Sequence, residues 1–171
     1  KGLSRAPGDV IGLLLSDVIF ALRDVLSHVA AAFAAGADAV YGDLDYVRRG
    51  APDEVIRRWR SGHFHPSRLS FGWMPPHPAL FLRRAVIDRL GGYDTSFRIS
   101  GDYDTVLRYF SSAGFVARYL PEVLVKMRVG GESNRSLGRI LTKSSEDLRA
   151  IRANGIGGVH TLFLMNLRKV R

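Results

Sequence analysis

A nearly continuous apolar run, Asp9-Val-Ile-Gly-Leu-Leu-Leu15, follows Pro7-Gly8 near the start of the sequence. Such a run predicts a strand buried on both faces of a parallel sheet. Over residues 24–35 the apolar side chains recur at helical spacing, and Gly36 can adopt the positive φ that ends a helix. The alternating residues 37–41 then predict a short strand. Strand, helix and strand in this order indicate an α/β layer with a right-handed crossover.

Further elements are expected along the rest of the chain. Proline recurs through residues 50–78, which predicts a long irregular loop around Trp59 and Trp73. After this loop the patterns predict a strand at 79–82, helices at 83–90 and 100–114, strands at 116–119 and 123–129, and helices at 136–154 and 159–171. We therefore expect a domain over 1–134 and a pair of basic amphipathic helices over 135–171.

The composition limits the class of protein. Of 171 residues, 46% are hydrophobic and 24% charged, as in an ordinary folded domain and unlike a disordered tail or a coiled coil. The chain has no cysteine, which excludes disulfides, a thiolate nucleophile and a Cys-ligated zinc site. The formal net charge is +9, and residues 51–171 carry 20 Lys/Arg against 10 Asp/Glu. This surplus predicts a surface that attracts anions.

Six short segments carry a more specific signal. They are Gly8-Asp-Val-Ile-Gly-Leu-Leu-Leu-Ser-Asp17, Ala39-Val-Tyr-Gly-Asp43, Gly72-Trp-Met-Pro-Pro-His-Pro-Ala-Leu-Phe81, Leu90-Gly-Gly-Tyr-Asp94, Gly101-Asp-Tyr-Asp104 and Gly130-Gly-Glu-Ser-Asn134. Their order and spacing resemble those of bacterial family 2 glycosyltransferases with the GT-A fold, over essentially the whole chain. The resemblance implies an α/β protein with an incomplete GT-A, Rossmann-like mixed sheet flanked by helices and a C-terminal helical pair. It also implies that the N-terminal nucleotide-binding half of the fold is missing.

By this resemblance the chain is an inverting glycosyltransferase. It would transfer a sugar from a nucleotide-diphosphate sugar to the hydroxyl of a glycan or lipid-linked acceptor, in cell-surface polysaccharide or glycolipid synthesis. The family implies Mn²⁺ or Mg²⁺ at a carboxylate that corresponds to Asp17, and oxygen ligands suit both ions. Val18 occupies the place where the family has a second acid, and Leu15 replaces a usual polar residue. A turn or capping role is the alternative for Asp17.

Two further aspartates form a literal Asp-x-Asp, Asp43-Leu44-Asp45. On a strand their side chains would point the same way, so a metal or donor could be held between them. Turn chemistry after Gly42 is an equally good explanation.

The general base implied by the family corresponds to Asp102, at the start of a predicted helix. The exposed N–H groups of a first helical turn favour an ionised carboxylate. A simple interaction with the helix dipole is the alternative for Asp102, and it is the favoured explanation for Asp104.

Several other residues are candidate contacts to the acceptor or the diphosphate. His77 is held between prolines and could bond to sugar hydroxyls, and Trp59 and Trp73 could stack on a sugar or a lipid. Structural roles are equally good explanations for all three side chains. Arg128, together with Gly130, Gly131 and Ser133, could meet a diphosphate through a guanidinium and N–H groups.

Two rival functions come from other classes. The chain could be a catalytically inactive fragment or partner-binding module of the same fold, which the residues Leu15 and Val18 favour. It could also be a basic nucleic-acid-binding domain, but its arginines are scattered and no nucleic-acid motif is present, so no nucleic acid is expected. The basic amphipathic helices predict a cytoplasmic protein that attaches peripherally to the anionic inner face of a membrane.

Overall fold

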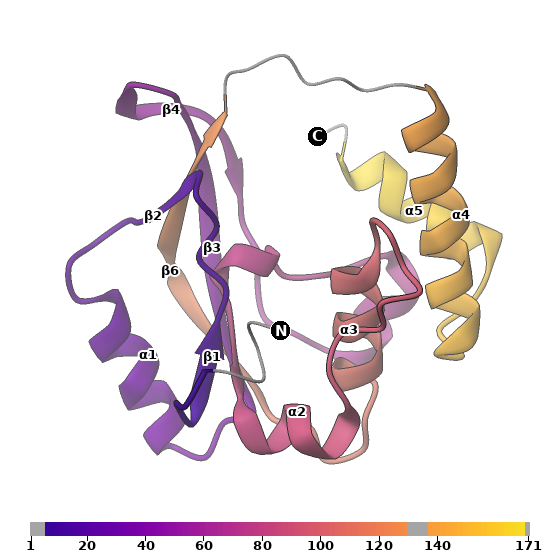
Figure 1. Cartoon of the computed structure of the whole chain (residues 1–171), viewed down its shortest axis with the longest axis horizontal. Coiled ribbons are helices and arrows are strands. Elements are labelled where there is room, and N and C mark those ends of the chain that lie inside the picture. The colour runs from indigo at the N-terminus through magenta and orange to yellow at the C-terminus, as the bar shows by residue number, and fades with distance from the viewer. Residues whose placement is uncertain (1–5, 130–136, 170–171) are drawn as a thin grey trace. The chain divides into compact units, whose positions relative to one another are not determined.

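A computed structural model describes residues 6–129 and 137–169 (Figure 1). Contacts divide the chain into two compact units. The sheet unit contains the described residues of 1–64, 75–89 and 116–133, and the helical unit contains those of 65–74, 90–115 and 134–171. Residues 90–115 belong here to the same unit as the C-terminal segment, whereas the sequence predicts the consecutive segments 1–134 and 135–171.

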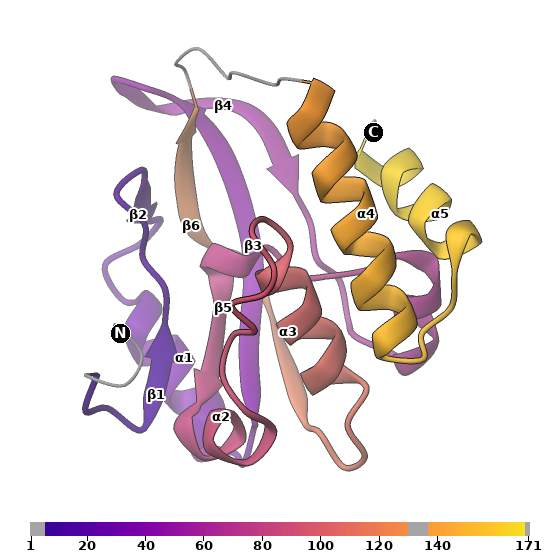
Figure 2. The same ribbon diagram turned by 45° about the vertical axis from the view of Figure 1, so that its right-hand side comes forward.

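The sheet unit is built on six strands. They are β1 (Val10–Gly12), β2 (Val18–Phe20), β3 (Ala39–Arg48), β4 (Ala51–Trp59), β5 (Leu80–Arg83) and β6 (Ala117–Val129). The order across the sheet is β1-β5-β3-β6-β2, and β4 also pairs with β3 (Figure 2). Among the strand pairings of the described residues, that of β3 with β6 is parallel and the others are antiparallel, so the sheet is mixed. The unit also contains α1 (Val25–Ala34), the 3-10 helix η3 (His77–Ala79) and most of α2 (Arg84–Leu90).

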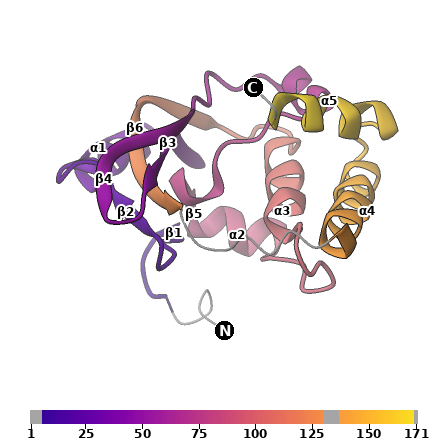
Figure 3. The same cartoon turned by 90° about the horizontal axis from the view of Figure 1, so that it is seen from above.

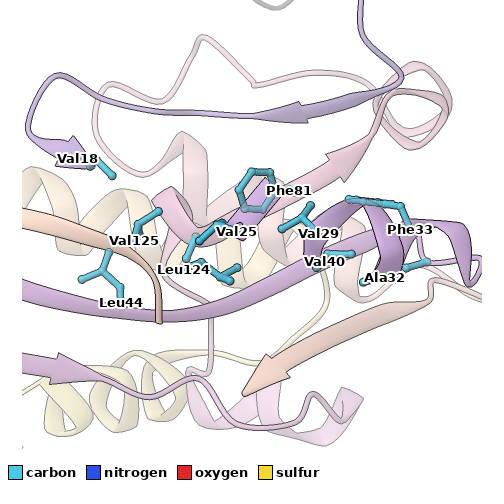
Figure 4. Close-up of a cluster of buried hydrophobic side chains, with 12 residues drawn as sticks. Val18, Val25, Val29, Ala32, Phe33, Val40, Leu44, Phe81, Leu124 and Val125 are labelled. Carbon is cyan, nitrogen blue, oxygen red and sulfur yellow. The ribbon is translucent and has the colours of Figure 1, made fainter. Parts of the chain in front are cut away.

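Strand β3 is the centre of this sheet. Its whole length pairs with β6 on one side, while on the other side residues 39–41 pair with β5 and residues 44–48 with β4. Helix α1 supplies Val25, Val29 and Phe33 to a core that continues through Val40 and Leu44 of β3 (Figure 4). Burial of this helical stripe against the sheet removes apolar surface from water and so stabilises the unit.

The helical unit contains η2 (Pro66–Phe71), α3 (Gly101–Phe110), α4 (Leu137–Ala153) and α5 (Val159–Lys169) (Figure 3). Ala150 and Ile151 of α4 and Met165 of α5 are buried. Gly72 has a φ of 71°, and a Cβ at this position would collide with Met165. Glycine is therefore required where η2 passes α5.

The expected mixed α/β fold with helices flanking a mixed sheet is confirmed, and so are the helices that begin near residues 24, 83, 100 and 136. Gly36 has the positive φ expected where α1 ends, and Gly91, just after α2, has one as well.

Three expectations about strands were wrong. The run 9–15 is not a strand buried on both faces, because β1 covers only residues 10–12, pairs antiparallel with β5 and leaves Leu13, Leu14 and Leu15 exposed. Residues 50–78 are not all irregular, since β4 is a strand that pairs with β3 alone and tolerates Pro52 there. Residues 117–129 form one strand, and Pro121 lies at a register shift rather than in a turn.

Candidate functional site

The candidate residues are divided between the two units. Asp17, Asp43, Asp45, Trp59, His77 and Arg128 belong to the sheet unit, and Trp73, Asp102 and Asp104 belong to the helical unit. Ser133 lies outside the described residues, as do Gly130 and Gly131. Each group is therefore described within its own unit.

Asp43 and Asp45 are brought together on β3 by one arginine. Nη1 of Arg60 lies 2.9 Å from Oδ1 of Asp45, and Nε lies 3.5 Å from Oδ2 of Asp43. Both aspartates are buried, with 4% and 7% of their surface exposed, whereas the Arg60 side chain is 44% exposed. Burial of two carboxylates is tolerable here because a cation is shared between them.

Two neutral groups also donate hydrogen bonds to the Asp43 carboxylate. Its Oδ1 accepts hydrogen bonds from the Ser61 N–H at 2.9 Å and the Tyr119 hydroxyl at 2.8 Å. The Ser61 hydroxyl donates to the Gly42 carbonyl oxygen at 2.7 Å. Burial, and then the hydrogen bond and the charge of Asp43, raise the pKa of the Tyr119 phenol. Tyr119 therefore remains a donor at neutral pH, and the chain after β4 is tied to β3.

Aromatic contacts reinforce this tie. The rings of Tyr41 and Tyr119 stack with centroids 5.4 Å apart, and His63 meets Tyr119 edge-on at 5.2 Å. The Tyr41 hydroxyl donates to the Gly62 carbonyl oxygen at 3.0 Å. Residues 60–63 are thus fixed against β3 and β6 by both polar and ring contacts.

These partners bear on the expected metal site. A divalent cation needs several free oxygen ligands, but the Asp43 and Asp45 carboxylates already receive protein donors. Among residues 6–129 and 137–169, no group of three or more His, Asp or Glu side chains is placed to hold a metal ion. The described residues therefore do not, as arranged, form a metal site by themselves.

Asp17 lies in the turn between β1 and β2 and is partly exposed. Its carbonyl oxygen accepts a hydrogen bond from the Arg128 N–H at 2.8 Å, and the Arg128 guanidinium donates to the Ser16 carbonyl oxygen at 2.5 Å. The structure thus brings Asp17 and Arg128 together. Val18, the next residue, points into the core with 4% of its surface exposed, so its position does not face a ligand.

Asp102 and Asp104 share the first turn of α3 but differ in environment. The Asp102 carboxylate accepts a hydrogen bond from the Tyr103 N–H at 2.8 Å and is partly exposed. Asp104 is buried, accepts from the Asn154 amide at 3.0 Å and lies 3.4 Å from Nη2 of Arg108. Asp104 therefore joins α3 to α4, while Asp102 can meet a ligand.

A residue not identified from the sequence holds the segment that leads into α3. The carboxylate of Glu146, on α4, accepts hydrogen bonds from the N–H groups of Arg98 at 3.0 Å and of Ile99 and Ser100 at 2.9 Å each. These bonds, with that from Ser100 the strongest influence, lower the pKa of Glu146. Glu146 is 9% exposed, so its charge is held by backbone donors rather than by water.

The aromatic candidates lie in packed surroundings. Trp73 is buried, its ring lies 5.6 Å from that of Phe110, and Arg68 lies over it at 5.9 Å. Trp59 is the last residue of β4 and packs against the core of the sheet unit. These positions favour the structural explanation for both tryptophans. His77 begins η3 after Pro76, and its Nδ1 is buried.

Two residues, Arg60 and Glu146, contact the candidate residues or the segment beside them and were not identified from the sequence. Arg60 follows β4 within a cluster of basic residues, and only strand pairing places it beside Asp45. Glu146 had a usable signal, since it lies four and five residues before Ala150 and Ile151 and so on the buried side of a helix. A charged residue on a buried face calls for donors, although the sequence could not name them.

Comparisons with known proteins give relatives by sequence. No model of a known protein family matches the chain. The chain is 32% identical over 137 residues to proteins named "PGL/p-HBAD biosynthesis glycosyltransferase" from Mycobacterium bovis (strain BCG / Pasteur 1173P2) and Mycobacterium tuberculosis (strain ATCC 25177 / H37Ra). The match covers 78% of this chain and 51% of each relative, so the chain spans about half the length of the curated relatives it matches.

One solved structure supports the fold. The chain is similar to the mannosyltransferase PcManGT from Pyrobaculum calidifontis, solved in complex with GDP-Man and Mn²⁺, with a TM-score of 0.58 and 18% sequence identity. The similarity covers 95% of this chain and 46% of that protein. The mixed sheet with flanking helices is therefore an arrangement that a known glycosyltransferase also has.

Proposed function

We propose that this chain is part of a glycosyltransferase that transfers a sugar, with inversion, from a nucleotide-diphosphate sugar to an acceptor hydroxyl. The observation that carries the proposal is the contrast in the first turn of α3, where Asp104 is buried and bonded while Asp102 is partly exposed. The names of the sequence relatives support the reaction class, and the name of the structural neighbour supports a nucleotide-sugar donor. A glycan or glycolipid acceptor, in cell-surface polysaccharide or glycolipid synthesis, fits the relatives' role in PGL/p-HBAD biosynthesis.

In this reaction Asp102 is the general base. The acceptor oxygen forms a bond to the anomeric carbon as the bond from that carbon to the diphosphate breaks on the opposite face of the sugar. The hydroxyl proton passes to a carboxylate oxygen of Asp102. The Tyr103 N–H, at the start of α3, donates to this carboxylate at 2.8 Å and helps to hold it in place. Arg128, anchored beside Asp17, is the proposed cation for the diphosphate.

Asp17 is the one residue that we propose as a ligand of a divalent cation. Manganese in the structural neighbour suggests Mn²⁺ or Mg²⁺, but the described residues offer this single carboxylate without the further ligands a protein site needs. We therefore derive no step of the transfer through a metal ion. Calorimetric titration of GDP-mannose, UDP-glucose and dTDP-glucose, with and without Mn²⁺, measures both donor choice and metal dependence.

Transfer itself is tested with the intact protein, those three donors and a lipid extract as acceptor. A new glycolipid that appears only with the active protein and one donor supports the proposal. No donor binding and no product under any of these conditions favours the rival function, a partner-binding module of the same fold.

We also propose that the protein works peripherally on the cytoplasmic face of an anionic membrane. Val159, Phe163 and Leu167 recur every fourth residue of α5 and are 62%, 61% and 51% exposed, so they form an apolar stripe that packing within the unit does not cover. No helix among the described residues is long and apolar enough to cross a membrane. The basic surplus adds attraction to anionic headgroups of roughly 1 kcal/mol per well-placed side chain.

Vesicle sedimentation tests this attachment. We expect recovery with phosphatidylglycerol vesicles at low salt, less with phosphatidylcholine, and a clear loss for Phe163→Ser. Equal recovery with neutral and anionic vesicles would contradict the proposal.

A further inference from the structure

The segment before α3 is held by a side chain of another helix, Glu146 of α4. The Glu146 carboxylate accepts three backbone hydrogen bonds from consecutive residues, with Oε1 facing Arg98 and Oε2 facing Ile99 and Ser100. Helices are ordinarily capped by the residue at their own N-cap position. Here that residue is Ser100, and its hydroxyl is directed to the Lys143 carbonyl oxygen at 3.5 Å instead of to the helix. The Glu146 carboxylate on α4 bonds the three residues that lead to the helix, so it holds this segment without capping α3 itself.

These three bonds end two residues before the proposed base. Ser100, the last residue that Glu146 holds, precedes Gly101, and Asp102 comes next. Gly101 is the first residue of α3, and the Asp104 N–H donates to the Ser100 carbonyl oxygen at 3.0 Å. Residues 98–100 are therefore tied to the helical turn that carries Asp102, and the direction of the Asp102 side chain depends on how firmly they are fixed. Bonds from N–H groups to a charged acceptor are about twice as strong as neutral ones, which suits Glu146 to this task.

Helix α4 is itself firmly seated. Ala150 and Ile151 are fully buried, and Lys143 pairs with the buried Asp147 at 2.9 Å. A bond to α3 itself comes from the residue that follows α4, where the Asn154 amide donates to Asp104 at 3.0 Å. The two links differ in kind, since Asn154 bonds the Asp104 side chain within α3 and Glu146 bonds the backbone of the segment that leads to Asp102.

We propose that Glu146 is a positioning residue that acts through residues 98–100 to fix the reactive orientation of Asp102. This role rests on the proposed function, in which Asp102 is the general base. Glu146 touches backbone N–H groups and contributes through geometry alone.

The test is Glu146→Gln in the intact protein, with Asn154→Ala as the matched control. Glutamine is isosteric but cannot present acceptor oxygens to all three N–H groups. We expect kcat to fall by about 10- to 100-fold with the donor KM within about twofold, because misplacement of a catalytic group acts on turnover. Hydrogen exchange should accelerate at the amides of residues 98–100. Asn154→Ala should lower the melting temperature yet leave kcat near the wild-type value.

A double mutant separates positioning from general loss of structure. If Glu146 acts through Asp102, then Glu146→Gln lowers kcat no further once Asp102→Asn is present. An equal further fall in that background would overturn the proposal. So would an unchanged kcat in Glu146→Gln accompanied by faster exchange at residues 98–100.

Failure of the proposed function gives a different pattern. Full turnover in Asp102→Asn alone would remove the base, and with it this role of Glu146. An inactive Asp102→Asn beside a fully active Glu146→Gln would overturn the role of Glu146 only. If the glutamine variant does not fold, Glu146→Asp keeps the charge and shortens its reach, and the same fall in kcat at unchanged donor KM is expected.

Discussion

Removal of the Asp43 carboxylate separates a structural role from a metal-binding one. In Asp43→Ala the Ser61 N–H and the Tyr119 hydroxyl lose their shared acceptor, and Arg60 keeps only Asp45. Hydrogen bonds to charged groups contribute about 1.5–3 kcal/mol each, and the buried Ser61 N–H is left unpaired. The Tyr119 hydroxyl is only part-buried and can regain water. We therefore expect the free energy of unfolding to fall by about 2–4 kcal/mol.

Urea unfolding in EDTA measures this loss. With a slope near 2 kcal/mol per molar, the midpoint should fall by about 1–2 M. The control is Asp53→Ala, because Asp53 pairs with Lys126 at 3.1 Å but its side chain is 98% exposed. Exposed pairs contribute about 0–1 kcal/mol, so its midpoint should hardly move.

Urea unfolding repeated in Mn²⁺ instead of EDTA can refute the structural role of Asp43. A structural carboxylate gives the same loss in EDTA and in Mn²⁺. If Mn²⁺ stabilises the wild-type protein and Asp43→Ala abolishes that gain, then Asp43 binds the ion and its satisfaction by Arg60, Ser61 and Tyr119 is not its main role.

Other consequences concern the core, pH and the apolar stripe. Val18→Asp is expected to lower stability by several kcal/mol without a gain in Mn²⁺ binding, since it puts a carboxylate into the core; thermal unfolding and calorimetry check this. The pKa of Glu146 is lowered in the folded state, so its contribution is full above the ordinary carboxyl range and lost as pH falls through the lowered pKa. Urea unfolding of wild type and Glu146→Gln should therefore differ at about pH 7 and converge as the pH falls through the lowered pKa of Glu146. Phe163→Ser should reduce vesicle binding, whereas thermal unfolding should be nearly unchanged because the side chain is exposed.

Elements with a strong local pattern could be predicted from the sequence. Helix α1 has its apolar stripe and Gly36, and α2 has the glycine pair after Leu90. Strand β1 could not be predicted with its true length, because an apolar run does not show whether both faces of the strand will be covered. In this structure Leu13, Leu14 and Leu15 remain exposed beside a three-residue strand.

In the candidate site, too, local features could be predicted from the sequence and long-range partners could not. Asp102 and Asp104 could be placed in a first helical turn, because the helix pattern after Ser100 is local. The partners that distinguish them come from far along the chain, as Asn154 does for Asp104. Arg60 likewise neutralises Asp43 and Asp45 only because β4 returns antiparallel to β3. Pairings of this kind are set by tertiary structure and leave no local pattern.

The most direct test of Asp102 as the general base compares Asp102→Asn with Asp104→Asn in one sugar-transfer assay on the intact protein. We predict that Asp102→Asn lowers turnover by on the order of 10² or more with donor affinity nearly intact, because only the base is lost. Asp104→Asn should lower the melting temperature but keep turnover within about threefold, because asparagine retains one acceptor oxygen for Asn154. Unchanged turnover in Asp102→Asn would contradict the assignment of the base.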